Sequence, residues 1–146
     1  MPRVLAVDWG ERRVGVALSD PSGMLATGLP TLTVTGRDDA VRQIVALARA
    51  REAERVVVGL PLLLSGERGE AAERATAFAE ALGVASGLPV ELLDERMTSA
   101  LSTRRLHEAG VRGARVKARV DQGAAVALLE TWLQRQRVRG ESDGGA

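Results

Sequence analysis

Three carboxylates in this chain of 146 residues stand where a folded protein rarely leaves a charge. Asp8 ends a short aliphatic run, Glu95 follows another, and Asp121 falls on the apolar stripe of a predicted helix. A carboxylate buried without a partner or a metal is costly, so its presence needs a reason. The three acids are therefore our candidate catalytic residues.

If these three acids converge, their oxygen atoms determine the chemistry. Like charges within a few ångströms cannot all stay ionised without a cation. The chain has no cysteine and one histidine, His107, so oxygen ligands would select Mg²⁺ or Mn²⁺. One or two such ions activate water for in-line attack on a phosphodiester. The pattern predicts metal-dependent hydrolysis, with Asp8, Glu95 and Asp121 as both catalytic residues and metal ligands.

Each acid also has a structural alternative. Asp8 sits at the turn of a predicted hairpin and could simply cap it. Gly15, inside the returning strand, indicates close approach of a backbone or a ligand, which capping does not explain. Either Glu95 or its neighbour Asp94 could pair with Arg96, because both end the same predicted strand.

The position of Asp121 is the more informative one. Asp121 is spaced from Ala125, Leu128 and Trp132 so that all four residues would lie on one face of a helix, and the other three are apolar. A charge on that stripe needs either a metal or a buried ion pair, for which Arg119 and Arg96 are candidates.

Positive charge is concentrated in the last third of the chain. The net charge is only +1, but residues 1–95 carry ten basic and fourteen acidic side chains, whereas residues 96–146 carry ten and five. Such a run can be a solvated face, but its place between two candidate metal ligands favours phosphate binding. Aromatic residues are few, so recognition should rest on shape and backbone, with Trp9 the aromatic best placed to touch substrate. The candidate substrate-binding residues are Trp9, Arg12, Arg96, Arg104, Arg105, Arg115 and Lys117.

Five predicted strands position these residues. They cover about residues 4–7, 14–18, 26–34, 55–59 and 90–94, and helices are expected at about 37–52, 70–85, 99–107 and 115–136. The first three strands form an antiparallel meander, and the strand–helix–strand order that follows implies parallel pairing. The predicted fold is α/β, a five-stranded mixed sheet with helices on both faces. The loop at 59–69 either covers the site or packs its leucines under the next helix.

Composition is that of a globular domain, with 45% apolar and 27% charged residues. No apolar run reaches the roughly 18 residues of a membrane span, and no leader opens the chain. We expect a soluble, cytoplasmic protein that does not contact membranes. Residues 1–137 should form a single domain and residues 138–146 a disordered tail.

Four stretches together resemble the YqgF family, also called RuvX, of RNase H-like nucleases. The matching stretches are 7–17, 58–62, 94–98 and 117–125, and they occur in order along nearly the whole domain. The resemblance implies an RNase H-like fold with Asp8, Glu95 and Asp121 as the acidic triad. It also implies that Arg96 and Lys117 hold phosphate or orient the carboxylates.

Members of that family are described as Holliday junction resolvase-like and as nucleases that mature the 5′ end of precursor 16S ribosomal RNA. The resemblance therefore implies an endonuclease for branched DNA or structured RNA, acting in recombination and repair or in ribosome biogenesis. The alternative is a noncatalytic nucleic-acid-binding factor in ribosome assembly or DNA repair. Junction resolvases usually act as dimers, which leaves a homodimer open. ATPases of the actin type use a similar hairpin but need a second copy of the domain, for which this chain is too short.

Overall fold

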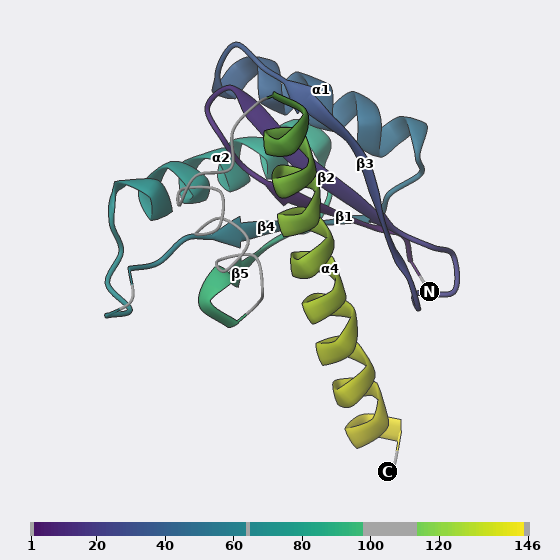
Figure 1. Ribbon diagram of the computed structural model, residues 1–146. Coiled ribbons are helices and arrows are strands. Elements are labelled where there is room, and N and C mark those ends of the chain that lie inside the picture. The colour runs from purple at the N-terminus through teal and green to yellow at the C-terminus, as the bar shows by residue number, and fades with distance from the viewer. Residues whose placement is uncertain (1, 64, 98–113, 145–146) are drawn as a thin grey trace.

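The computed structural model describes residues 2–63, 65–97 and 114–144, and the backbone alone for residues 97, 114–122 and 140–144. Within these ranges five strands form one sheet (Figure 1). The strands are β1 (Val4–Asp8), β2 (Arg13–Ser19), β3 (Ala26–Thr33), β4 (Arg55–Leu60) and β5 (Val90–Asp94). The helices are α1 (Arg37–Ala50), α2 (Glu70–Ser86), the short 3₁₀ helix η1 (Glu95–Met97) and α4 (Ala114–Gly144).

The strand order is β3-β2-β1-β4-β5. β1 pairs antiparallel with β2, and β2 pairs antiparallel with β3. β4 is parallel to both β1 and β5, as expected when a helix connects consecutive strands. The predicted α/β fold, an antiparallel meander extended by parallel strands with helices on both faces, is confirmed.

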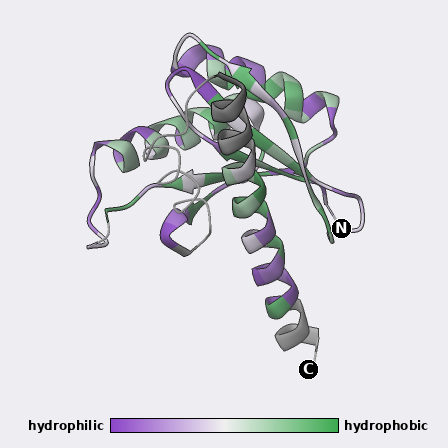
Figure 2. Ribbon diagram, in the orientation of Figure 1, coloured by the Kyte–Doolittle hydropathy of each residue, from purple (hydrophilic) through white to green (hydrophobic). Residues whose placement is uncertain are grey.

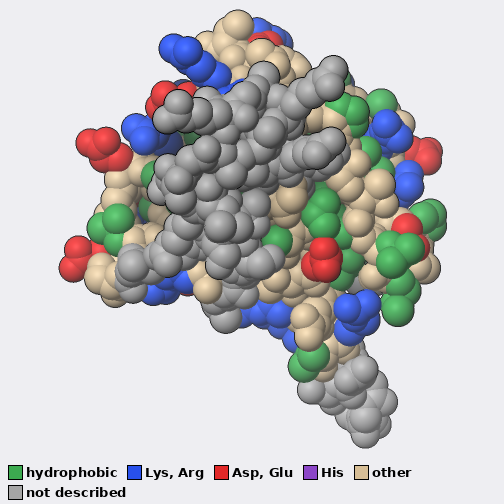
Figure 3. Space-filling model, in the orientation of Figure 1, with side chains coloured by type: hydrophobic (Ala, Val, Ile, Leu, Met, Phe, Trp, Pro, Cys, Tyr) green, Lys and Arg blue, Asp and Glu red, His purple; other side chains and the backbone are tan. Residues whose placement is uncertain are grey.

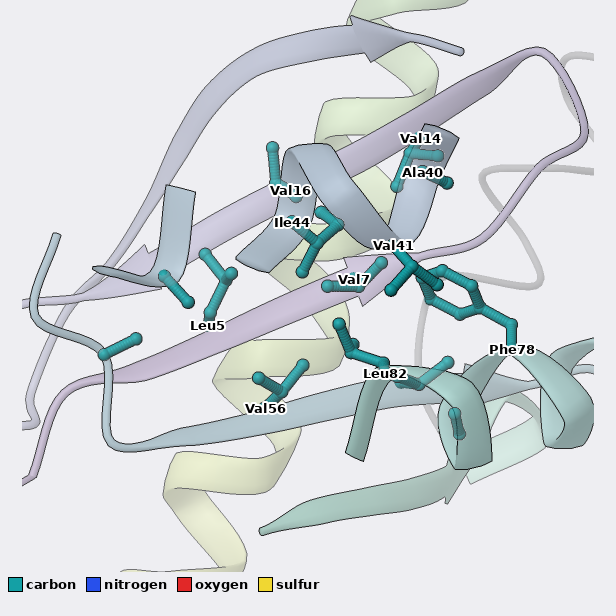
Figure 4. Packing of buried hydrophobic residues seen from close by; sticks show 14 of the residues in the cluster. Leu5, Val7, Val14, Val16, Ala40, Val41, Ile44, Val56, Phe78 and Leu82 are labelled. Carbon is teal, nitrogen blue, oxygen red and sulfur yellow. The ribbon is translucent and has the colours of Figure 1, made fainter. Parts of the chain in front are cut away.

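Alternation along β1 divides the core into two layers. Leu5 and Val7 belong to a cluster with α1 and α2, in which Ile44, Phe78 and Leu82 are fully buried (Figure 4). Because successive side chains of a strand point to opposite faces, the residues between them face the other way. The second cluster, on the α4 side, includes Val4, Ala6, Ala17, Val57, Leu93, Ala124, Ala125, Leu128, Leu129 and Leu133. Figure 1 accordingly shows α4 on one side of the sheet and α1 and α2 on the other.

Helix α4 extends beyond its predicted end. The sequence predicts a last residue near Gln136, where the apolar stripe stops, and a disordered tail from Val138. The structure instead continues the helix to Gly144, and Figure 2 shows it mostly hydrophilic past the sheet. Adding a residue to an existing helix needs no new nucleation, so the helix can continue through Arg137 and Arg139 and even past Gly140, whose helix propensity is low.

Another predicted helix, 99–107, lies outside the described residues together with His107, Arg104, Arg105 and Arg112. Within the part of the chain that the structure describes, no helix combines the length and apolar character that crossing a bilayer requires.

Candidate active site

Two of the three candidate acids lie at the same edge of the sheet. Asp8 is the last residue of β1, and Glu95 immediately follows β5. Both strands run parallel to β4, which lies between them, so their carboxyl ends meet at one edge. This is the edge at which α/β sheets usually carry their sites. Both acids are deeply buried, with 4% of Asp8 and 1% of Glu95 exposed.

Both acids also belong to the face that α4 covers. The α4 cluster contains the buried side chains of Ala6, Val57 and Leu93. These residues stand two positions before Asp8, Gly59 and Glu95, respectively. Side-chain direction repeats every two residues in a strand, so the three positions share that face. The partner of Asp8 across the hairpin is Gly15, which places no side chain beside the carboxylate.

Gly59 on β4 provides the space that Glu95 occupies. A Cβ atom at Gly59 would lie 2.5 Å from Oε1 of Glu95 and 2.9 Å from Cδ1 of Leu128 on α4. Both distances are far shorter than an ordinary carbon contact. The absence of a side chain at Gly59 therefore lets the carboxylate and the helix approach the same point of the sheet.

The structure describes Asp121 through its backbone only, as a residue of α4. It lies one helical turn before Ala125 and two turns before Leu128, both fully buried against the sheet. Among the side chains that the structure describes, no group of three acids, histidines or cysteines comes together. The role of Asp121 as a third ligand therefore stays a prediction.

The pKa values of Glu95 and its neighbour Asp94 are shifted in opposite directions. Burial raises the pKa of Glu95 from 4.5 to about 7, and the charge of Asp94 adds to the rise. A carboxyl group with such a pKa binds either a proton or a cation near neutral pH. The donor set of buried carboxylate oxygens fits a hard divalent ion.

Arg96 pairs with Asp94 rather than with Glu95. Its backbone N–H donates to Oδ1 of Asp94 at 2.9 Å, and its Nη2 donates to Oδ2 at 2.7 Å. The side-chain hydrogen bonds from Arg96 lower the pKa of Asp94 below its ordinary 3.8. The Arg96 side chain stays 34% exposed.

The loop between β4 and α2 packs beside Arg96. Gly66 has a φ of +90°, and a Cβ there would lie 3.3 Å from Nη1 of Arg96. The loop closes on itself through hydrogen bonds from Leu63 N–H to the Glu67 carbonyl (3.0 Å) and from Gly66 N–H to the Leu63 carbonyl (2.8 Å). Leu63 is 52% exposed, Leu62 is partly buried and Leu64 lies outside the described residues, so both sequence interpretations of this loop stay open.

Trp9 and Arg12 lie apart from the carboxylates. Trp9 stacks on Phe78 of α2, with ring centroids 4.5 Å apart and planes 10° from parallel. It packs against the α1 and α2 cluster, on the opposite face of the sheet from Asp8. Asp8 and Trp9 are adjacent in sequence, and adjacent side chains along a strand point to opposite faces of the sheet. That Trp9 touches substrate stays a prediction, and this position places any such contact on the α1 and α2 face of the sheet.

The other predicted substrate contacts are only partly placed. Arg115 and Lys117 lie on the first turns of α4 as backbone positions, and Arg104 and Arg105 lie outside the described residues. In the view of Figure 3, basic and acidic side chains alternate around the described surface and form no single basic field. Gly59 belongs to the stretch 58–62 that resembles the family, but sequence reasoning assigned it no role in making room for Glu95.

Comparison with known proteins gives consistent matches along the chain. A family model described as "RuvX: Holliday junction resolvase" matches residues 2–135. A Chloroflexus aurantiacus protein, provisionally named as a pre-16S rRNA nuclease, is 44% identical over 134 residues, covering 92% of this chain and 88% of that protein. A Pelotomaculum thermopropionicum protein with the same name is 44% identical over 144 residues, covering 97% and 94%. One from Streptomyces avermitilis is 43% identical over 145 residues, covering 97% and 92%.

A solved structure shares the fold. It is that of T. thermophilus RuvC in complex with a Holliday junction substrate, with a TM-score of 0.56 and 16% identity, and the match covers 93% of this chain and 96% of that one. Together with the strand order, this likeness confirms the predicted RNase H-like architecture.

Proposed function

Because this chain belongs to the RuvX family, we propose that it is a divalent-metal-dependent endonuclease that hydrolyses phosphodiester bonds in structured nucleic acid. The observation that most supports this is the burial of Asp8 and Glu95 on one face and at one edge of the sheet, with 4% and 1% exposed. A buried acid with a raised pKa at such an edge, as Glu95 is, is typical of functional sites.

Asp8, Glu95 and Asp121 would hold Mg²⁺ or Mn²⁺. When bound, the ion supplies an activated water and offsets the charge of the carboxylates. Glu95, for whose carboxyl group Gly59 leaves room, would be one of the residues that hold the ion, and its raised pKa means that it would have to be deprotonated to do so. Arg96, held in place by Asp94 and partly exposed, would contact a phosphate oxygen of the substrate.

The relatives' names favour precursor 16S ribosomal RNA as the substrate. Ribosome biogenesis in the cytoplasm is the setting that we propose with that substrate. A second candidate is branched DNA, which the description of the family model favours. Arg104, Arg105, Arg115 and Lys117 are proposed to contact the nucleic-acid backbone in either case, because arginine and lysine bind phosphates of RNA and DNA alike. A homodimer would suit the DNA substrate, where two strands are cut.

The test is cleavage with Mg²⁺ or Mn²⁺ of a precursor 16S RNA fragment and of a four-way DNA junction. Asp8→Asn, Glu95→Gln and Asp121→Asn should each abolish cleavage while binding persists. Glu130→Gln, an exposed acid further along α4, is the matched control and should cut normally. If the wild-type protein binds both substrates but cuts neither with either ion, the protein is a noncatalytic binding factor instead.

A further inference from the structure

The edge of the sheet that carries the acids has a groove on its other face. The β1–β2 turn and the first turns of α1 and α2 enclose about 820 Å³ there. Gly10 makes the turn tight, since a Cβ at this position would overlap the carbonyl oxygen of Arg13. The turn thus lies between the two faces of the sheet: Asp8 before it belongs to the α4 face, and Trp9 lines the groove on the α1 and α2 face.

The groove has basic side chains available for a ligand. Of its four arginines, Arg74 lies 3.6 Å from Glu11, and Arg42 lies 3.6 Å from Asp39. The other two, Arg12 and Arg37, are exposed and form no ion pair with any residue that the structure describes. One acid of the lining, Asp38, is likewise exposed and without an ion pair among the described residues.

An aromatic surface is fixed at the same place. Phe78 is completely buried, and Trp9 stacks on it while remaining partly exposed to the groove. Figure 4 shows the Phe78 ring beside Val41, and both residues belong to the same buried cluster as Leu82. A tryptophan held in this way loses little freedom when a base stacks against it.

We propose that this groove binds a single-stranded segment of the nucleic acid, with a base stacked against Trp9 and phosphates at Arg12 and Arg37. The inference rests on the proposed function, because the segment is part of the same substrate. Stacking platforms beside basic side chains are the usual means of holding single strands without reading their sequence. A strand that crosses the short β1–β2 turn passes from the acids to the groove.

The experiment uses the tryptophan itself. The chain has two, so Trp132→Phe leaves Trp9 as the only one, and circular dichroism checks that this variant is folded. Its fluorescence is titrated with twelve-residue oligouridylate and oligothymidylate in EDTA, where no cutting takes place. Saturable quenching is expected with both, and stronger binding of the RNA would indicate a contact to the 2′-hydroxyl.

Charge variants in the same background locate the phosphate contacts. Arg12→Ala and Arg37→Ala should each weaken binding and lower the slope of log affinity against log salt by about 0.7. Asp38→Asn should strengthen binding, since it removes a negative charge from the lining. Arg49→Ala, at the other end of α1 and outside the groove, is the matched control and should bind like the parent.

The groove is refuted if saturating oligonucleotide leaves Trp9 emission unchanged, or if Arg49→Ala weakens binding as much as Arg12→Ala. Asp8→Asn separates this inference from the proposed function. It should lose cleavage of the structured substrates and keep the quenching by single strands. If single strands quench the fluorescence but the wild-type protein never cleaves, the groove is supported and the nuclease proposal is wrong. If the protein cleaves but single strands do not quench, the nuclease is supported and the groove is refuted.

Discussion

The two faces of the sheet use the same strands but different side chains. Toward α1 and α2 the buried residues are large, and they include Leu5, Val7, Val16, Val56, Ile44, Phe78 and Leu82. Toward α4 many are alanine, including Ala6, Ala17, Ala124, Ala125 and Ala127. Large side chains bury more apolar area, so the first face contributes more to stability.

The small residues of the α4 face have a different effect. They let the helix backbone approach the sheet closely, and at the edge this approach covers two carboxylates. Removing water from a carboxylate disfavours its charged form, which is why Glu95 has a pKa of about 7. One face of the sheet therefore mainly stabilises the fold. The other face carries the candidate catalytic acids, and burying them costs some stability.

The largest loss of stability is expected on the α1 and α2 face. Phe78→Ala removes a fully buried ring and should lower the free energy of unfolding by about 3–5 kcal/mol. Val84→Ala, on the same helix but 88% exposed, should change it by less than about 0.5 kcal/mol. Urea denaturation measures both. Equal effects of the two substitutions would mean that this face does not carry the core.

The next effect concerns Glu95 and pH in the metal-free protein. Between its unfolded pKa near 4.5 and its folded pKa of about 7, the folded state holds more protons, so stability falls as pH rises through this window. The loss should reach about 3 kcal/mol above pH 7. Glu95→Gln should remove this pH dependence, whereas the control Glu130→Gln should keep it.

Added Mg²⁺ sharpens the same measurement. A cation that binds the charged carboxylate should restore the stability of the wild-type protein at pH 8 and leave Glu95→Gln unchanged. If both proteins respond equally, the ion binds elsewhere.

Gly59→Ala should have a smaller effect on stability but a specific one on the site. Its Cβ would meet Glu95 Oε1 at 2.5 Å and Leu128 Cδ1 at 2.9 Å, so the carboxylate or the helix must move. We expect a loss of about 1–3 kcal/mol in unfolding free energy from overpacking. Because a ligand is displaced, Mn²⁺ affinity measured by calorimetry should also fall, by about 10–100-fold.

Gly83→Ala is the matched control for that substitution. The nearest atom to its Cβ would be Val90 Cγ2 at 3.7 Å, an ordinary contact, and the position is helical. It should be neutral or stabilise by about 0.5–1 kcal/mol. An unchanged Mn²⁺ affinity in Gly59→Ala would show that the glycine does not shape the site.

Much of this comparison was predictable from the sequence. Alternation in the short strands and the strand–helix–strand order predict the sheet, and the end of β1 predicts the edge position of Asp8. The side of the turn on which Trp9 lies also follows from alternation, but its stacking on Phe78 depends on how α2 packs. That contact is tertiary, and no local pattern near residue 9 contains it.

The partner of Arg96 was another choice that the sequence left open. Asp94 and Glu95 are adjacent and chemically alike, and both were candidates for the pair. The two acids differ in burial, because Glu95 is 1% exposed under α4 whereas the Asp94 side chain is 20% exposed and can reach Arg96. The depth of a side chain results from packing between elements far apart in the chain, so spacing alone does not give it.

The smallest expected effect tests that division between the two acids. Arg96→Lys keeps the charge but replaces a planar fork by a single ammonium group, which cannot reproduce the hydrogen bonds at 2.7–3.2 Å. The pKa of Asp94 should rise toward 3.8, while that of Glu95 should stay near 7, because burial is its main cause. NMR titration of the carboxyl carbons measures both. A shift of Glu95 as large as that of Asp94 would mean that Arg96 acts on both faces, and the electrostatic separation of the buried site from its rim would then be wrong.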